Sequence, residues 1–96
     1  MKLHELKIKH KYLIDIESGI KTFEIRKNDR DYQVGDLVHF IDLQDFELNL
    51  YKPLVLCNAK ALYRIVYVLK DIPEYGLDKD YCIFGIKEIR EKENDK

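Results

Sequence analysis

A lysine, a glutamate and an arginine stand close together in residues 19–26, in the pattern G-x-K-x-x-E-x-R. Lys21 and Arg26 can donate charged hydrogen bonds to a phosphate or to the polar edge of a base. The planar guanidinium of Arg26 can do so through two parallel bonds. Glu24 can accept a hydrogen bond from a base, or it can hold the two cations in place. These residue types predict a binding site for an anionic or nucleotide-like ligand.

The spacing of this segment also predicts which side chains share a face. In a strand, alternate side chains point to opposite sides. Thr22, Glu24 and Arg26 would then share one face, and Phe23 and Ile25 the other. We expect the Phe23 and Ile25 pair to face the core. The charged side chains would then be held against space outside the packed interior.

Other residues extend the candidate site on separate grounds. Lys7 and Arg30 could add phosphate contacts, and Tyr81 and Tyr32, both close to turns, could stack on unpaired bases. His4 lies on a strand face with two aliphatic residues. That position fits both a hydrogen-bonded core histidine and a ligand-binding one.

Composition bounds the class of protein. The chain has 96 residues, of which 46% are hydrophobic, and this suits one domain with one core. Its net charge of −1 argues against indiscriminate nucleic-acid binding. Residues 1–30 hold eight Lys/Arg and five Asp/Glu, a net of +3, while the other 66 residues have a net of −4. This asymmetry permits a polyanionic partner.

Neither cysteine usage nor hydropathy predicts a special site. Cys57 and Cys82 are isolated and have no histidine at zinc spacing, so we expect buried, reduced thiols, no metal and no cofactor. No apolar run approaches the ~18 residues of a membrane span. Lys2, Glu5 and Lys7 interrupt any signal-peptide core. We therefore expect a cytoplasmic protein without a membrane partner.

The period of the apolar residues predicts the elements that position the charged cluster. Alternation predicts strands, and an amphipathic stripe formed by Tyr12, Leu13, Ile16 and Ile20 predicts a helix over residues 9–18, which ends at Gly19. The predicted strands cover residues 3–8, 21–27, 37–43, 60–70 and 81–90.

Several details qualify this assignment. Tyr63, Ile65 and Tyr67 would share one face of the fourth strand, and Gly85 indicates a bulge or a close backbone approach in the last one. Within residues 44–57, the residues Phe46, Leu48 and Leu50 alternate like a strand. Pro53 would restrict that strand to an edge or a loop. We could not assign a role to this segment.

One helix and five or six strands, several of them apolar on both faces, predict an α+β fold. A small, strongly bent or closed β-barrel with the helix at one end satisfies the pattern best, with short helical turns as a possible addition. We expect one domain over residues 1–90, followed by a charged, frayed tail over residues 91–96.

The motif resembles a known signature. Gly19, Lys21, Glu24 and Arg26 match the G-x-K-x-x-E-x-R pattern of the ASCH domains, members of the PUA-like β-barrel superfamily. The wider runs over residues 4–7, 21–31 and 34–36 resemble a bacterial and phage branch, a domain of unknown function described as RNA-binding-like. The resemblance implies a PUA-like barrel. Its ligand cleft would lie between the helix and the barrel mouth, lined by the signature residues.

The resemblance also implies two kinds of function. PUA-like relatives bind RNA, whereas some ASCH members are small amidohydrolases that act on acetylated cytidine. In those enzymes the signature lysine is the base and a threonine is the nucleophile. This chain keeps Lys21 but carries Glu24 in place of that threonine, with Thr22 two residues away.

Three functions therefore remain open. The first is an RNA- or nucleotide-binding module that uses Lys21, Glu24 and Arg26. The second is a hydrolase acting on a modified nucleoside, with Lys21 as base and Glu24 as acid or orienting group. The third is a protein–protein adaptor that adds a strand through the apolar residues 46–54. The sequence leaves the oligomeric state open between a monomer and a weak dimer.

Overall fold

A computed structural model describes residues 1–50 and 62–89 of the chain. These residues form a five-stranded sheet with the strand order β1-β3-β4-β5-β2, together with short helical elements. The elements in chain order are β1 (Leu3–Ile8), α1 (His10–Glu17), β2 (Phe23–Lys27), β3 (Leu37–Asp42), α2 (Leu43–Glu47), β4 (Leu62–Lys70), the 3-10 turn η2 (Pro73–Tyr75) and β5 (Tyr81–Glu88). The α+β class predicted from the sequence is confirmed.

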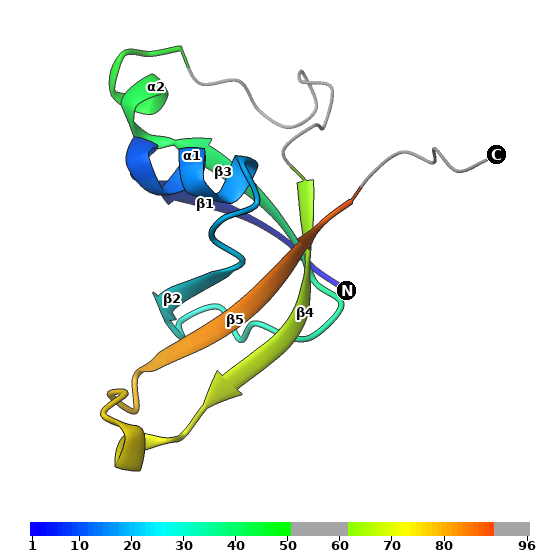
Figure 1. The fold of residues 1–96 in the computed structure, drawn as a ribbon, viewed down its shortest axis with the longest axis vertical. Coiled ribbons are helices and arrows are strands. Elements are labelled where there is room, and N and C mark those ends of the chain that lie inside the picture. Colours follow the sequence, from blue (N-terminus) through cyan, green and yellow to red (C-terminus); the bar gives the residue numbers. More distant parts are fainter. Residues whose placement is uncertain (51–61, 90–96) are drawn as a thin grey trace, which may run out of the picture.

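The sheet is strongly curled, and the side chain of Arg26 in the edge strand β2 reaches the backbone of the other edge strand, β1. β1 pairs with β3 in parallel, whereas the β3–β4, β4–β5 and β5–β2 pairs are antiparallel. Figure 1 shows β4 and β5 extending as a long hairpin away from α1 and α2, which lie at the other end of the molecule. We call the gap between the edges β1 and β2 the seam. Arginine side chains cross it, as described below.

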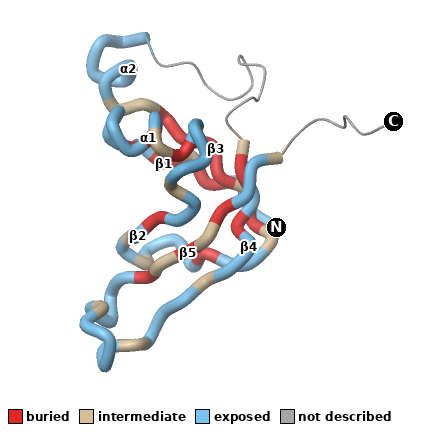
Figure 2. The backbone as a smooth tube through the Cα atoms, in the orientation of Figure 1, coloured by how far each residue is buried: buried red, intermediate tan, exposed pale blue. Residues whose placement is uncertain are grey.

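The core lies where the strands curl around one another, and the hairpin tip is exposed (Figure 2). Phe84, Leu6, Ile65, Val38 and Cys82 are the largest fully buried side chains. The predicted burial of Cys82 is confirmed, and Cys57 lies outside the described residues. The prediction that His4, Leu6 and Ile8 share a face is also confirmed, because all three are buried.

Helix α1 packs on this core through fewer residues than the sequence predicts. Leu13 and Ile16 are buried, but Tyr12 is 39% exposed and Ile20 is 78% exposed. The helix ends at Glu17 before Gly19, which has the predicted left-handed conformation with φ of +85°. Ile20 therefore lies beyond the helix, and the helical period does not apply to it.

A β-bulge changes the alternation of β4. The register against β5 shifts between Ile65 and Tyr67, opposite Gly85, where the sequence indicated an irregularity. Because the bulge adds one residue, the side chains after it point to the other face. Tyr67 is 62% exposed, and Val68 packs against the core. The predicted sharing of one face by Tyr63, Ile65 and Tyr67 is therefore wrong at Tyr67.

The strand-like alternation of Phe46, Leu48 and Leu50 does not form a strand. Leu43 begins α2, and the side chain of Asp42 caps this helix by accepting a 2.9 Å hydrogen bond from the backbone N–H of Gln44. This cap favours a helical turn over the apolar alternation that includes Phe46. Leu48 and Asn49 form a turn after α2, and residues 51–57, with Pro53, lie outside the described residues, as do residues 60–61 and the predicted tail.

Candidate functional site

The three charged residues of the motif form one hydrogen-bonded cluster. The ammonium of Lys21 donates to Oε2 of Glu24 and, at 2.6 Å, to the carbonyl oxygen of Phe23. Nε of Arg26 donates to the other carboxylate oxygen, Oε1, at 2.9 Å. Glu24 thus receives a cation on each oxygen, and this fixes the relative positions of Lys21 and Arg26.

The cluster lies on the opposite face of β2 from the one predicted. Glu24 is buried at 5% exposure, whereas Phe23 and Ile25 are 43% and 53% exposed. The inner face of this edge strand borders the seam. Because Lys21 and Arg26 are both hydrogen-bonded to the Glu24 carboxylate, its burial costs less than that of an unpaired charge. The expectation that Phe23 and Ile25 face the core is therefore wrong. Both side chains are at the surface beside the charged cluster.

A pocket of about 430 Å³ adjoins the cluster, between β1, the start of α1 and β2. We call it pocket A. Its lining consists of basic, aromatic and aliphatic side chains around one carboxylate: Lys7, Ile8, Lys9, Tyr12, Lys21, Phe23, Glu24, Ile25 and Arg26. The lining therefore contains four cationic groups and one anionic group. The excess of positive charge favours an anionic ligand.

Aromatic rings stand beside the cations of pocket A. The Lys21 ammonium lies 4.8 Å from the centroid of the Phe23 ring and 5.6 Å from that of Tyr12. The ammonium of Lys7 lies 3.9 Å from the ring centroid of Phe46 in α2. The exposed faces of such rings can stack on a planar ligand group, and the neighbouring cations can hold its charge.

Arg26 also crosses the seam. Its Nη2 donates to the backbone carbonyl of Lys7 in β1 at 2.7 Å. A guanidinium has five N–H donors, and the contacts within the described part of the chain use two of them. Three remain for a ligand, while the two contacts fix the plane in which the guanidinium presents them.

The structure brings together some of the sequence-predicted site residues. Lys7, Lys21, Glu24 and Arg26 line pocket A. Arg30 and Tyr81 line a neighbouring pocket of about 290 Å³, which we call pocket B, and Arg26 lines both pockets. Thr22 lies outside pocket A and lines a third pocket with Lys21 and the end of β5. Thr22 is exposed, and Lys21 borders both this third pocket and pocket A.

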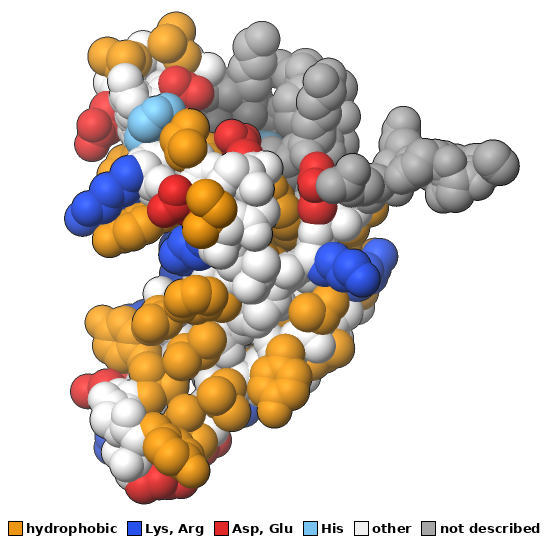
Figure 3. All heavy atoms as spheres, in the orientation of Figure 1, with side chains coloured by type: hydrophobic (Ala, Val, Ile, Leu, Met, Phe, Trp, Pro, Cys, Tyr) orange, Lys and Arg blue, Asp and Glu red, His pale blue; other side chains and the backbone are white. Residues whose placement is uncertain are grey.

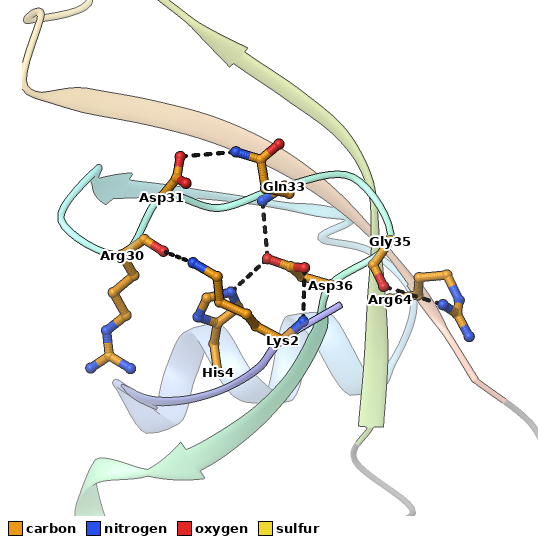
Figure 4. A network of polar contacts seen from close by, with 8 residues as sticks. All are labelled: Lys2, His4, Arg30, Asp31, Gln33, Gly35, Asp36 and Arg64. Carbon is orange, nitrogen blue, oxygen red and sulfur yellow. Dashed lines mark hydrogen bonds and ion pairs between the residues drawn. The ribbon is translucent and has the colours of Figure 1, made fainter.

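His4 lies in the core instead of the candidate site. It is 4% exposed, and its Nε2 lies 2.9 Å from Oδ2 of Asp36. Asp36 also accepts hydrogen bonds from the backbone N–H groups of Lys2 and Gln33 (Figure 4). This network fastens the start of β1 to the turn before β3. Of the two roles that the sequence left open, the geometry fits the hydrogen-bonded core histidine.

The surroundings of Asp36 stabilise its charged form. Burial alone would raise the pKa of this carboxyl group, but the hydrogen bonds from His4, Lys2 and Gln33 outweigh that effect and lower the pKa. Tyr32 packs between two rings of this core, at centroid distances of 4.8 Å from both His4 and Phe84. Since Tyr32 is 2% exposed, it is unsuited to stacking on a base.

Sequence reasoning missed several residues of pocket A. Tyr12 was assigned to the apolar stripe of the helix because it lies four residues before the buried Ile16, but it is at the edge of that stripe and borders the pocket. Phe23 and Ile25 were assigned to the core. Their alternation with charged residues was the available signal, but it could not show which face of the strand is buried.

The remaining observations concern alternatives to an anion site. Among the described residues, no group of three or more His, Cys, Asp or Glu side chains could hold a metal ion. No helix in residues 1–50 or 62–89 is long and apolar enough to span a membrane. Hydrophobic side chains gather toward the β4–β5 hairpin end (Figure 3). An apolar pocket of about 520 Å³ lies there, bordered by Leu69, Ile72, Tyr75 and Leu77 among others.

Comparisons with known proteins identify a family. No curated protein matches the sequence. A family model described as a domain of unknown function, DUF3850, matches residues 3–86 and thus includes every described strand except the last residues of β5. Because this match covers most of the chain and includes the whole charged cluster, the protein belongs to the DUF3850 family.

Proposed function

We propose that this protein is an RNA- or nucleotide-binding module whose ligand occupies pocket A. The observation that carries the proposal is the lining of that pocket, where four cationic groups surround one carboxylate and two aromatic rings stand beside them. A phosphate would contact Arg26 and the lysines, and a base would stack on the exposed ring of Phe23. Glu24 would position Lys21 and Arg26 for this contact.

We also propose that the fold is related to the PUA-like barrels. The support is the curled sheet together with the G-x-K-x-x-E-x-R residues, which border a pocket beside α1. In this interpretation the seam between β1 and β2 is the mouth of the barrel.

Binding without chemistry explains the cluster better than hydrolysis does. Lys21 and Arg26 are both paired with the carboxylate of Glu24, an arrangement that suits two cations positioned for an anionic ligand. Thr22 does not line pocket A, where Glu24 takes the position of the nucleophile in the related hydrolases. The adaptor hypothesis relies on residues 46–54, of which Phe46 and Glu47 belong to α2 and residues 51–54 lie outside the described residues.

A titration tests the proposed function directly. Fluorescence anisotropy would measure the affinity of short single-stranded and hairpin RNAs for the wild type and for Arg26→Gln. Arg64→Gln is the matched control, because Arg64 also donates to a backbone carbonyl, that of Gly35 at 3.2 Å, but lies outside pocket A. We expect Arg26→Gln to weaken binding by about tenfold or more, and Arg64→Gln to have little effect.

The salt dependence gives a second readout. For single strands, the slope of log affinity against log salt changes by about 0.7 for each phosphate contact, so Arg26→Gln should reduce the slope by about that amount. Equal affinities and slopes for all three proteins would contradict the proposal. Incubation with acetylated nucleosides tests hydrolysis, and product formation that depends on Lys21 would favour the enzyme instead.

A further inference from the structure

A second cationic pocket continues the site along the seam. Pocket B shares Ile25 and Arg26 with pocket A, so the two pockets meet at these residues. Its charged lining is Arg26, Lys27 and Arg30 against the single acid Asp29. It also has an aromatic wall at Tyr81, which is 40% exposed. Each pocket therefore combines an excess of positive charge with an exposed ring.

Two arginines, Arg26 and Arg30, reach across the seam to the backbone of β1. Nη2 of Arg26 donates to the carbonyl of Lys7 at 2.7 Å, and Nη1 of Arg30 donates to the carbonyl of Glu5 at 3.2 Å. These carbonyls are two residues apart on the outer edge of β1, which corresponds to roughly 7 Å in a strand. This distance is comparable with the separation of neighbouring phosphates in an extended nucleic-acid strand.

The anchoring of Arg30 orients its guanidinium. Figure 4 shows its side chain extending away from the network around Asp36, while its own backbone carbonyl accepts a hydrogen bond from the Lys2 ammonium. Arg30 is exposed, so the donors that it does not use toward Glu5 can reach a ligand. Arg26 and Arg30 are thus two preorganised cations along one edge.

We propose that the ligand is a single-stranded nucleic acid of at least two nucleotides, which lies along the seam with one phosphate at Arg26 and the next at Arg30. This inference rests on the proposed function and extends it from pocket A to both pockets. One base would stack on Phe23 in pocket A and the neighbouring base on Tyr81 in pocket B. A mononucleotide would fill only half of this site.

The experiment compares ligand lengths on the full-length protein. The probes are a nucleoside monophosphate, a dinucleotide with two phosphates and a tetranucleotide, each in ribose and deoxyribose form. Calorimetry would measure their affinities for the wild type, Arg30→Gln, Arg30→Lys and Tyr81→Ser. The controls are Arg64→Gln and Tyr75→Ser, because Tyr75 is an exposed tyrosine that borders neither pocket A nor pocket B. Circular dichroism would confirm that each variant is folded.

We expect the dinucleotide to bind at least about tenfold more tightly than the mononucleotide. Arg30→Gln and Tyr81→Ser should remove most of this gain, and Arg30→Lys should retain part of it. The two controls should behave like the wild type. A preference for the ribose probes would identify the ligand as RNA, and equal binding would identify a single strand of either kind.

Two results would overturn the inference, and they are distinguishable. If mononucleotide and dinucleotide bind with equal affinity and Arg30→Gln changes neither, the site is confined to pocket A and the proposed function stands. If no probe binds the wild type, the proposed function fails and the inference fails with it.

Discussion

Nε of Arg26 donates a 2.9 Å hydrogen bond to Oε1 of Glu24, two residues earlier on the same strand. Because Glu24 also accepts from the Lys21 ammonium, one buried carboxylate organises two cations. The three residues have a net charge of +1 and are partly enclosed, so the cluster stays positive after its internal pairing. This relationship explains how a charged motif can lie on the inner side of an edge strand and still line a pocket.

The first prediction concerns stability. Glu24→Gln leaves Lys21 and Arg26 close together without their shared counter-charge. We expect a loss of about 1–3 kcal/mol in the free energy of unfolding, below the value for a fully buried pair because both cations are partly exposed. Urea denaturation measures this change. Glu74→Gln is the control at an exposed glutamate, and an equal, small effect of both substitutions would contradict the account.

The second prediction tests which face of β2 is buried. Phe84 is fully buried, so Phe84→Ala should cost about 3–5 kcal/mol. Phe23 is 43% exposed, so Phe23→Ala should cost less than about 1 kcal/mol. The Phe23 substitution should instead weaken RNA binding, by about 1–3 kcal/mol if a base stacks on the ring. A stability loss at Phe23 as large as that at Phe84 would show that the ring is in the core.

The third prediction separates the His4–Asp36 network from the ligand site. Asp36→Asn should lower stability at neutral pH by about 1–3 kcal/mol and leave RNA affinity unchanged, because the network fastens β1 without lining pocket A. The pKa of Asp36 is lowered in the folded state, so its contribution is present above the unfolded pKa of about 3.9 and is lost as the pH falls through the folded pKa. Denaturation of the wild type and of Asp36→Asn between neutral pH and pH 3 measures the difference in their free energies of unfolding, which should become smaller toward the acidic end.

The fourth prediction concerns His10, at the start of α1. Its Nδ1 lies 2.7 Å from Oδ2 of Asp42, the capping residue of α2. This hydrogen bond and the charge of Asp42 raise the pKa of His10, with smaller contributions from Asp45 and Glu17. The folded state therefore binds the proton more tightly than the unfolded state.

The pH dependence follows from the direction of that shift. The contribution of His10 to stability is complete below its unfolded pKa of about 6.5 and is lost as the pH rises through the folded pKa. The melting temperature of the wild type should therefore fall between pH 5.5 and pH 8.5 by more than that of His10→Gln. If the melting temperatures of the wild type and His10→Gln change with pH in the same way, the hydrogen bond between His10 and Asp42 does not contribute to stability.

Local patterns predicted much of the fold. The alternation of His4, Leu6 and Ile8 predicted β1, because all three side chains face the core. Gly19 predicted the end of α1, because the chain there has a positive φ. Asp42, in contrast, looked like the end of a strand, and its capping of α2 overrode the apolar alternation that followed.

The site depended on contacts that local patterns do not encode. The contact between Arg26 of β2 and the carbonyl of Lys7 in β1 joins residues that are 19 positions apart in sequence. The hydrogen bond from Arg30, which lines pocket B, to the carbonyl of Glu5 spans 25 residues. The motif therefore predicted the residues of the cluster but not its orientation or its extent.

The most direct test of the central claim is an NMR titration of the wild type with an RNA tetranucleotide, following backbone amide shifts. The account predicts the largest shifts at residues 7–9, 12 and 21–26, around pocket A, and small shifts at residues 72–77 near the hairpin tip. Shifts confined to the hairpin tip, or no shifts at saturating RNA, would contradict the claim that Lys21, Glu24 and Arg26 form a ligand site.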